Sequence, residues 1–200
     1  MLALVDYGAG NLGSVRKGLE AAGATVLIAS TVDHLEQCDG IVVPGVGSFR
    51  ATASIAPRWR EACLRRVEAG VPLLGICLGM QWLFDGSDEA PELSGLGLIP
   101  GRCRRIRADR PLKVPHVGWN ALAIAAPSRI LEGVADETYV YFTHSFAAPV
   151  TPQCAASVTH GETFAAVVER GNVAGVQFHP EKSGRAGLRI LRNFVAMTRS

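Results

Sequence analysis

The sequence has no long apolar run and little charge of either sign. No stretch approaches the roughly 20 apolar residues that a membrane-spanning helix needs, and the first apolar run, at residues 2–5, ends at Asp6. We therefore expect neither a membrane span nor a secretory signal peptide. The 20 Lys and Arg against 18 Asp and Glu leave a formal charge of +2, which gives no reason to expect a polyanionic partner.

Paired cysteines are also missing. The five cysteines are odd in number, far apart and without the Cys-x-x-Cys or Cys/His spacing of a zinc site; they are Cys38, Cys63, Cys77, Cys103 and Cys154. We expect free thiols, no metal site and a reducing compartment, the cytoplasm. The pattern of cysteines does not say whether one of these thiols does chemistry.

Apolar sequence is abundant in a chain of one-domain length. Hydrophobic residues make up 48% of the 200 residues and charged residues 19%, which excludes a disordered chain. The 22 glycines and 11 prolines show no Gly-X-Y period, so collagen is excluded and a turn-rich compact fold is favoured. We predict one domain over residues 1–200.

The pattern of short apolar runs predicts an α/β fold. In the first half, strands at residues 2–6, 25–29, 40–43 and 72–77 alternate with helices at 12–22 and 58–69, which is typical of βαβ units on a mostly parallel sheet. The second half indicates antiparallel or mixed strands at 103–107, 114–124, 139–146, 155–159, 164–169 and 173–178. A helix from about residue 183 carries Leu188, Leu191 and Val195 inward. We therefore expect a mostly parallel central sheet, flanked by helices, with additional antiparallel strands.

A glycine motif near the N-terminus looks like a nucleotide site. Gly8, Gly10 and Gly13 form G-x-G-x-x-G between a strand and a helix, and Asp33 follows at about the spacing of a dinucleotide site. However, Asp6 ends the strand where a pyrophosphate would lie, and its carboxylate would repel that anion. We interpret the glycines as a structural or partner-facing turn and predict no cofactor.

A second glycine motif surrounds one of the cysteines. Residues 75–79 read GICLG, so Cys77 lies between two glycines where a predicted strand gives way to a helix. This is the cysteine counterpart of the G-x-S-x-G turn that presents a nucleophile. Such a turn strains the backbone of the nucleophile, and flanking glycines avoid collisions with the neighbouring strand and helix. The helix N-terminus favours a thiolate; the alternative is one more buried thiol.

A base for that thiol is present near the C-terminus. His179 and Glu181 lie two residues apart after the last predicted strand, so an extended segment puts both side chains on one face. Pro180 disfavours the helical conformation for His179. A histidine beside a carboxylate is the pair of base and orienting group that a thiol nucleophile needs. Together with Cys77, the segment predicts a Cys-His-Glu triad.

Two further stretches call for an interpretation. The PGVG at residues 44–47 is a candidate for supplying one backbone donor to an oxyanion, with the Leu78 N–H as the other; an ordinary glycine turn is the alternative. A basic stretch contains Arg102, Arg104, Arg105, Arg107, Arg110 and Lys113. We interpret it as a solvated edge strand protected by charge, with phosphate or partner contact as the alternative. No aromatic residues are interleaved, so nucleic-acid binding is not expected.

The motifs resemble those of a known family. LGICLGMQ at residues 74–81, together with HPE at 179–181, resembles the class I (triad) glutamine amidotransferases, whose glutaminase domain makes ammonia for a synthase. PGVGSF at 44–49, KVPHVGWN at 113–120 and HPEKSG at 179–184 are similar to one group within it, the glutaminase subunits of histidine biosynthesis. The resemblance runs essentially from end to end.

The resemblance implies a reaction and a partner. Cys77 would be the nucleophile on L-glutamine, His179 the general base and acid, and Glu181 the group that orients His179. The oxyanion and substrate would be held by Val46, Gly47, Leu78, Gln81, Ser145 and Phe146. The partner would be a cyclase subunit with a (β/α)8 barrel, forming a heterodimer near Asn11, Trp119 and Lys182. Two positions depart from the family pattern, which more usually has a small residue at Arg50 and a tyrosine at Phe146.

Three alternatives stay open at this point. The glutaminase of a different amidotransferase would share the triad. A catalytically silent docking subunit would share the fold. A cysteine hydrolase or chaperone of another family would share the cysteine turn but would not predict the His-Pro-Glu segment.

Overall fold

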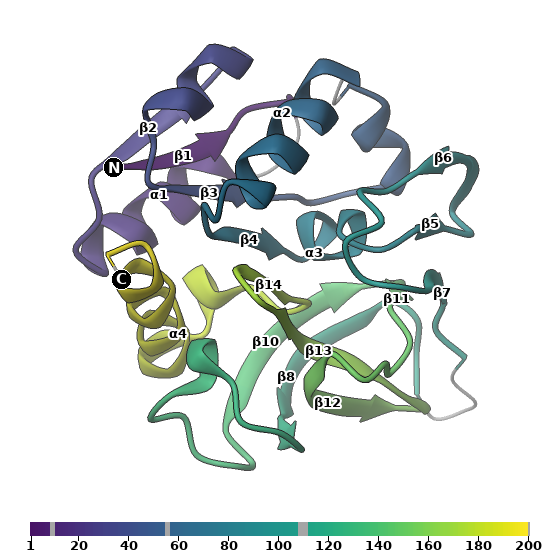
Figure 1. Cartoon of the computed structure of the whole chain (residues 1–200). Helices are drawn as coiled ribbons and strands as arrows, with labels where there is room; N and C mark the ends of the chain where they lie inside the picture. Colours follow the sequence, from purple (N-terminus) through teal and green to yellow (C-terminus); the bar gives the residue numbers. More distant parts are fainter. Residues whose placement is uncertain (9–10, 55–56, 108–111, 200) are drawn as a thin grey trace.

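The computed structural model describes residues 1–8, 11–54, 57–107 and 112–199 (Figure 1). Gly10 of the N-terminal glycine motif and Arg110 of the basic stretch lie outside the described residues. The described strands form one sheet of eight strands, one of four and one of two.

The eight-stranded sheet runs through the middle of the molecule (Figure 1). Its order is β2 (Val26–Ala29), β1 (Leu2–Val5), β3 (Gly40–Val43), β4 (Leu73–Ile76), β14 (Val173–Val176), β13 (Glu162–Arg170), β12 (Cys154–His160) and β9 (Ala123–Ile124). The five strands from β2 to β14 pair in parallel, and the pairs from β14 to β9 are antiparallel. The predicted parallel first half and mixed second half are therefore confirmed.

Helices cover both faces of the parallel part. They are α1 (Leu12–Ala21), α2 (Pro57–Glu68), α3 (Leu78–Trp82) and α4 (Gly184–Met197). Leu2 and Leu4 of β1 share a core with α1 and α4, whereas Ala3 and Val5 share another with α2 and α3. Because β1, β3, β4 and β14 are buried along their whole length, they appear in the sequence as continuous apolar runs.

The remaining strands form two small sheets. The four-stranded sheet has the order β11 (Phe146–Ala147), β7 (Arg102–Arg105), β5 (Gly86–Ser87) and β6 (Ala90–Ser94). In the two-stranded sheet β8 (His116–Ala121) pairs antiparallel with β10 (Tyr139–His144). Short 3-10 helices complete the chain: η1 (Val32–Gln37), η2 (Phe49–Ser54), η3 (Arg129–Leu131) and η4 (Pro180–Lys182).

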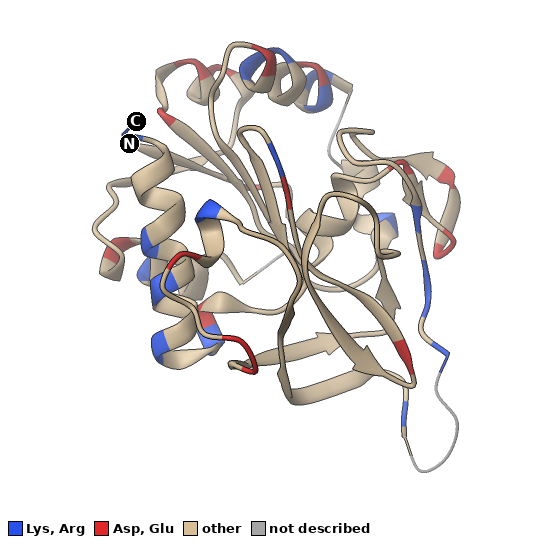
Figure 2. Cartoon of the chain, turned by 60° about the horizontal axis from the view of Figure 1, so that its bottom comes forward, with Lys and Arg blue, Asp and Glu red and all other residues tan. Residues whose placement is uncertain are grey.

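The prediction of an edge strand for the basic stretch is wrong. Strand β7 has β11 on one side and β5 on the other, so its backbone is paired along both edges. Cys103 is buried while Arg104 and Arg105 are exposed, so the exposed charges lie on a strand with a neighbour on each side. Lys and Arg positions are interspersed with Asp and Glu over the rest of the molecule (Figure 2).

Other differences concern boundaries. The strands predicted at 114–124 and 139–146 are each broken into two short strands that join different sheets. Leu188 of α4 is half-buried rather than inward, and Ile190 and Phe194 carry the core contact beside the predicted Leu191 and Val195. Strands β5 and β6 were not predicted, because β5 has two residues and β6 includes a proline, so neither shows a clear alternation.

The topology brings the motif segments to one edge of the sheet. Strand β3 leads into Pro44, β4 into Cys77 and β14 into Gln177 and His179. Because these strands are parallel neighbours, their carboxyl ends meet at the same edge, which is where open α/β sheets bind ligands.

Candidate active site

Cys77 lies in a strained turn between β4 and α3. Its backbone has φ +52° and ψ −106°, a combination that residues other than glycine rarely adopt. A Cβ on Gly75 would lie 2.5 Å from the Gly79 carbonyl oxygen, and a Cβ on Gly79 would lie 1.9 Å from the Val43 carbonyl oxygen. The glycines on both sides are therefore required by close backbone packing, as the motif predicts.

His179 and Glu181 form a buried pair. The Nδ1 of His179 donates to Glu181 Oε1 at 2.9 Å, and each side chain is 1% exposed. Burial by itself would lower the pKa of His179, but the neighbouring Cys77 and Glu181 outweigh it and raise the pKa to about 9. The structure thus brings all three residues of the predicted triad together.

The two residues meet across a turn rather than along an extended strand. His179 itself is extended, with φ −101° and ψ +96°, but residues Pro180–Lys182 form the 3-10 helix η4. Proline restricts the residue before it and is favoured in the first turn of a helix, so the same residue that extends His179 also starts η4. The expectation of a fully extended segment is corrected accordingly.

Ser183, which sequence reasoning missed, fixes this turn. Its buried hydroxyl donates to the His179 carbonyl oxygen at 2.7 Å and accepts from the Tyr141 N–H at 3.0 Å. The His179 N–H donates to the Tyr141 carbonyl oxygen at 2.9 Å. A Cβ on Gly187 would lie 1.9 Å from the Pro180 carbonyl oxygen, so α4 packs directly against η4.

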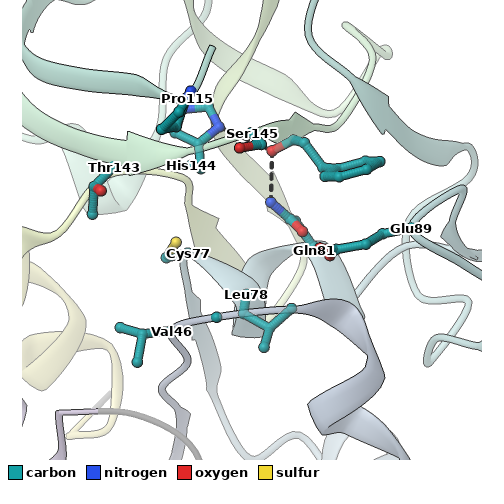
Figure 3. A pocket seen from close by; sticks show the side chains of 11 residues that line it. Val46, Cys77, Leu78, Gln81, Glu89, Pro115, Thr143, His144 and Ser145 are labelled. Atoms are coloured by element: carbon teal, nitrogen blue, oxygen red, sulfur yellow. Dashed lines mark hydrogen bonds between the residues drawn. The ribbon is translucent and has the colours of Figure 1, made fainter.

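A cavity of about 350 Å³ opens beside Cys77 (Figure 3). This volume is near the lower end of the range for small-molecule sites. All six residues expected to hold the substrate or oxyanion line it: Val46, Gly47, Leu78, Gln81, Ser145 and Phe146. Cys77 and Pro115 of the KVPHVGWN motif also line it, as do three residues that the sequence did not single out: Glu89, Thr143 and His144.

Two buried glutamines connect the cavity wall to the thiol. Gln81 Nε2 donates to the Phe146 carbonyl oxygen at 2.8 Å (Figure 3) and to Gln177 Oε1 at 3.1 Å. Gln177 Nε2 in turn donates to Cys77 Sγ at 3.6 Å. Sequence reasoning missed Gln177, although one polar residue in the buried run 173–178 is a usable signal. The Phe146 contact is made by its backbone, so phenylalanine in place of tyrosine preserves it.

Glu89 is the single acidic residue among the described lining of this cavity. Its Oε2 accepts from the Phe49 N–H at 2.7 Å, which ties the residue to the start of η2. No motif in the sequence identifies it.

The loop at residues 44–47 packs against the cysteine turn. A Cβ on Gly45 would lie 2.5 Å from Leu78 Cβ, and the Tyr7 hydroxyl donates to the Pro44 carbonyl oxygen at 2.8 Å. Gly47 has φ +94°. The other departure from the family pattern, Arg50, pairs with Glu92 of β6 at 2.5 Å and does not line the cavity.

Two of the three expected interface residues lie together. Trp119 is 54% exposed and its ring is 6.0 Å from that of Tyr141, over which Lys182 Nζ lies at 5.9 Å. Asn11 lies at the start of α1, where its side chain accepts from the Ser14 N–H at 3.2 Å and caps the helix.

A carboxylate lies in the described part of the N-terminal glycine turn. Asp6 Oδ1 accepts from the Gly8 N–H at 3.1 Å, so a carboxylate already occupies that donor. In the described part of the chain, no group of three or more His, Cys, Asp or Glu residues could hold a metal ion. No described helix is long and apolar enough to cross a membrane.

All five cysteines are free and buried. Burial raises the pKa of four of them: Cys38, Cys63, Cys103 and Cys154. A raised pKa keeps a thiol protonated and unreactive near neutral pH. Cys77 alone of the five lies beside the His179–Glu181 pair.

Comparisons with known proteins agree with this geometry. The family described as "Glutamine amidotransferase class-I" matches residues 3–197. The chain is 45% identical to the imidazole glycerol phosphate synthase subunit HisH of Methanothermobacter thermautotrophicus over 100% of both chains. It is 50% identical to HisH of Gloeobacter violaceus, over 97% of this chain and 88% of that one.

Solved structures support the fold. A crystal structure of a glutamine amidotransferase superposes with a TM-score of 0.77 at 21% identity, covering 99% of each chain. The glutaminase domain of Trypanosoma brucei CTPS with bound acivicin gives a TM-score of 0.73 at 18% identity, over 99% of this chain and 93% of that one.

Proposed function

Because this chain belongs to the class I glutamine amidotransferase family, and within it to the glutaminase subunits of imidazole glycerol phosphate synthase, we propose that it hydrolyses L-glutamine through Cys77, His179 and Glu181. The observation that carries the proposal is the position of His179. Its Nδ1 is occupied by Glu181 at 2.9 Å, so Nε2 is the ring atom available to Cys77.

The raised pKa of His179, about 9, defines the starting state. Near neutral pH the ring is an imidazolium, which stabilises the thiolate of Cys77 beside it. The thiolate attacks the side-chain amide carbon of glutamine and forms a tetrahedral intermediate. His179 Nε2 then gives its proton to the departing nitrogen, and ammonia leaves behind a glutamyl thioester.

The neutral His179 serves as the base in the second half-reaction. It takes a proton from water, the resulting hydroxide attacks the thioester carbonyl, and glutamate leaves as the Cys77 thiolate is restored. Glu181 stabilises the imidazolium that forms in this step and keeps Nε2 directed at the thiol. Both side chains are 1% exposed, so their interaction is weakly screened by solvent.

Backbone N–H groups supply the oxyanion site in this proposal. The N–H of Leu78 follows the nucleophile directly, and the N–H groups of Val46 and Gly47 lie in the neighbouring loop. The packing of Gly45 on Leu78 supports this assignment, because it keeps the loop and the cysteine turn in contact.

The rest of the cavity suits the amino-acid end of glutamine. Glu89 Oε1 is the carboxylate oxygen that we assign to the substrate ammonium, since Oε2 is bound to the Phe49 N–H. Gln81, Ser145 and Phe146 form the wall that faces it. A 350 Å³ cavity with one acidic residue discriminates against large or doubly negative ligands.

The partner in this proposal is a cyclase subunit with a (β/α)8 barrel, bound as a heterodimer. Val117, Trp119 and Tyr139 leave one face of the β8–β10 sheet apolar and exposed. Residues alternate between faces along a strand, so Tyr141 and Thr143 continue the same face, and Thr143 lines the cavity. A partner on this face lies within one strand length of the site where ammonia forms. Free thiols suit the cytoplasm as its compartment.

The test is the release of glutamate and ammonia from glutamine, with and without the cognate cyclase and its ribonucleotide ligand. Cys77→Ala should abolish the reaction. Cys63→Ala is the matched control, because Cys63 is a buried thiol in α2 whose pKa is raised by burial; it should retain turnover. Undiminished activity in Cys77→Ala would remove the triad assignment. A solitary chain that hydrolyses glutamine at full rate would remove the partner assignment.

A further inference from the structure

A buried histidine pair lies behind the partner-facing sheet. His116 of β8 and His144 of β10 are opposite each other in the register of that sheet, on the face away from Trp119. They are 3% and 7% exposed, and His144 lines the cavity. The mechanism above uses neither of them.

The hydrogen bonds of His144 determine its tautomer. Nδ1 lies 2.9 Å from the Phe146 carbonyl oxygen. A carbonyl oxygen only accepts, so Nδ1 carries the proton. Burial lowers the pKa of His144 to about 3, so the ring is neutral and its Nε2 is an acceptor.

The neighbouring His116 also donates through Nδ1 and accepts through Nε2. Its Nδ1 lies 3.3 Å from His144 Nε2, and because that atom accepts, His116 Nδ1 donates. Burial lowers the pKa of His116 to about 4, so its Nε2 accepts in turn. Asn120 Nδ2 lies 3.3 Å from this Nε2 and is the donor.

The orientation of Asn120 is set independently at the far end. Its Nδ2 also donates to the Thr159 carbonyl oxygen at 3.0 Å, and its Oδ1 accepts from the Ala121 N–H at 2.9 Å. Both contacts require Asn120 Nδ2 to be the nitrogen that faces His116, which is the orientation that the histidine pair also requires. The chain from Asn120 through His116 and His144 to Phe146 therefore runs in one direction only.

We propose that His116 and His144 are positioning residues for glutamine binding. The Phe146 carbonyl at the end of their chain also accepts from Gln81 Nε2 at 2.8 Å, so one oxygen joins the histidine pair to the cavity wall. Through Gln177 the same network reaches Cys77 Sγ. With the His144 donor removed, the Phe146 carbonyl keeps only the Gln81 donor, and the cavity wall that they form is held less firmly. This inference rests on the proposed function, since it concerns the same substrate.

Two other roles for the histidines are less consistent with these contacts. Metal binding needs free ring lone pairs, and all four ring nitrogens of the pair are engaged in the chain. Simple packing would use any flat ring of the same size. His160 illustrates that case: its ring stacks on His116 at 4.2 Å, while its Nε2 donates to the Lys113 carbonyl oxygen, away from the chain.

A matched pair of substitutions separates positioning from packing. In His144→Asn the amide nitrogen takes the place of Nδ1 and keeps the donor to Phe146, whereas in His144→Gln it takes the place of Nε2 and that donor is lost. In the complex with the cyclase, we expect His144→Gln to raise KM for glutamine about tenfold, the size expected for one lost hydrogen bond at a buried carbonyl. Because the wall faces the non-reacting end of glutamine, kcat should change less than about twofold.

The controls make the outcome decisive. His144→Asn should stay within about threefold of the wild-type KM, and His160→Phe should match wild type. Equal effects of His144→Asn and His144→Gln, or an effect confined to kcat, would overturn the proposal.

A second measurement needs no variant and no turnover. Nitrogen-15 chemical shifts of the histidine rings at neutral pH should show both His116 and His144 as neutral rings protonated at Nδ1. An Nε2-protonated ring or an imidazolium at either position would contradict the chain. If the wild-type complex released no glutamate from glutamine, the proposed function would fail, while these spectra would still decide whether the chain exists.

Discussion

Replacing Gly79 by alanine tests whether backbone packing holds the cysteine turn in place. The added Cβ would lie 1.9 Å from the Val43 carbonyl oxygen, whereas real Cβ atoms almost never approach closer than 3.0 Å. Strand β3 and helix α3 must therefore separate by at least about 1.1 Å, and overpacking of this kind typically costs about 1–3 kcal/mol of stability. Val43 directly precedes the loop at 44–47, so the same shift widens the gap between Cys77 and the oxyanion donors proposed in that loop.

The effect on turnover should exceed the effect on stability. A displacement of about 1 Å at a reacting centre can lower the rate about 100-fold. Gly13→Ala is the matched control for stability: Gly13 is also helical, and its added Cβ would meet nothing within 4 Å. Alanine there should stabilise the chain by up to about 1 kcal/mol. Urea unfolding and glutamate release with the cyclase measure both effects, and a Gly79→Ala protein with wild-type unfolding midpoint and turnover would refute the reasoning.

Three other predictions follow from the charges and the exposed sheet. The pKa of His179 is raised to about 9, so its imidazolium is present below that pH and kcat/KM should fall as the pH rises through it. Glu181→Gln should move this alkaline fall of the pH profile to lower pH. A fall at the same pH would contradict the pairing of His179 with Glu181. The pKa of His144 is lowered, so the unfolded chain binds a proton that the folded chain does not, and stability falls as pH drops from 6.5 toward 3. His144→Phe should remove up to about 1.4 kcal/mol per pH unit of that slope in urea titrations, and an unchanged slope would count against a neutral buried ring. Trp119→Ala should weaken cyclase binding by more than about tenfold in Kd, as expected of a central aromatic contact, and unchanged Kd would exclude it from the interface.

The triad could be predicted from the sequence because each of its parts has a local signal. A cysteine between two glycines predicts a strained turn for steric reasons that involve only a few neighbouring residues, and Cys77 has that strained backbone. The His-Pro-Glu segment is local in the same way, although η4 shows that proline started a 3-10 helix where an extended strand was expected. The apolar runs predicted the strands that precede these segments, whereas the parallel pairing of β14 with β4, which brings the two strand ends to one edge, was seen only in the structure.

The residues of the cavity wall were predicted from the family resemblance rather than from their own chemistry. Gln81, Ser145 and Phe146 carry no pattern of their own. They meet at the cavity because β10 and β11, which belong to the two small sheets, end beside the cysteine turn that follows β4. The interior position of β7 likewise depends on which strands lie beside it. A basic stretch can have the same sequence in an edge strand and in an interior strand, so the sequence did not distinguish the two.

The local sequence by itself identified the nucleophile, its base and the strands that precede them. It could do so because backbone sterics and side-chain periodicity act over a few residues. Tertiary structure alone decided the roles of Glu89, Gln177 and the pair His116 and His144. Each has a hydrogen-bond partner that is far away in the chain. Gln177 meets Cys77 across 100 positions and His116 meets His144 across 28. Hydrogen-bond direction, and with it the tautomer of each ring, is defined only once those distant groups are in contact.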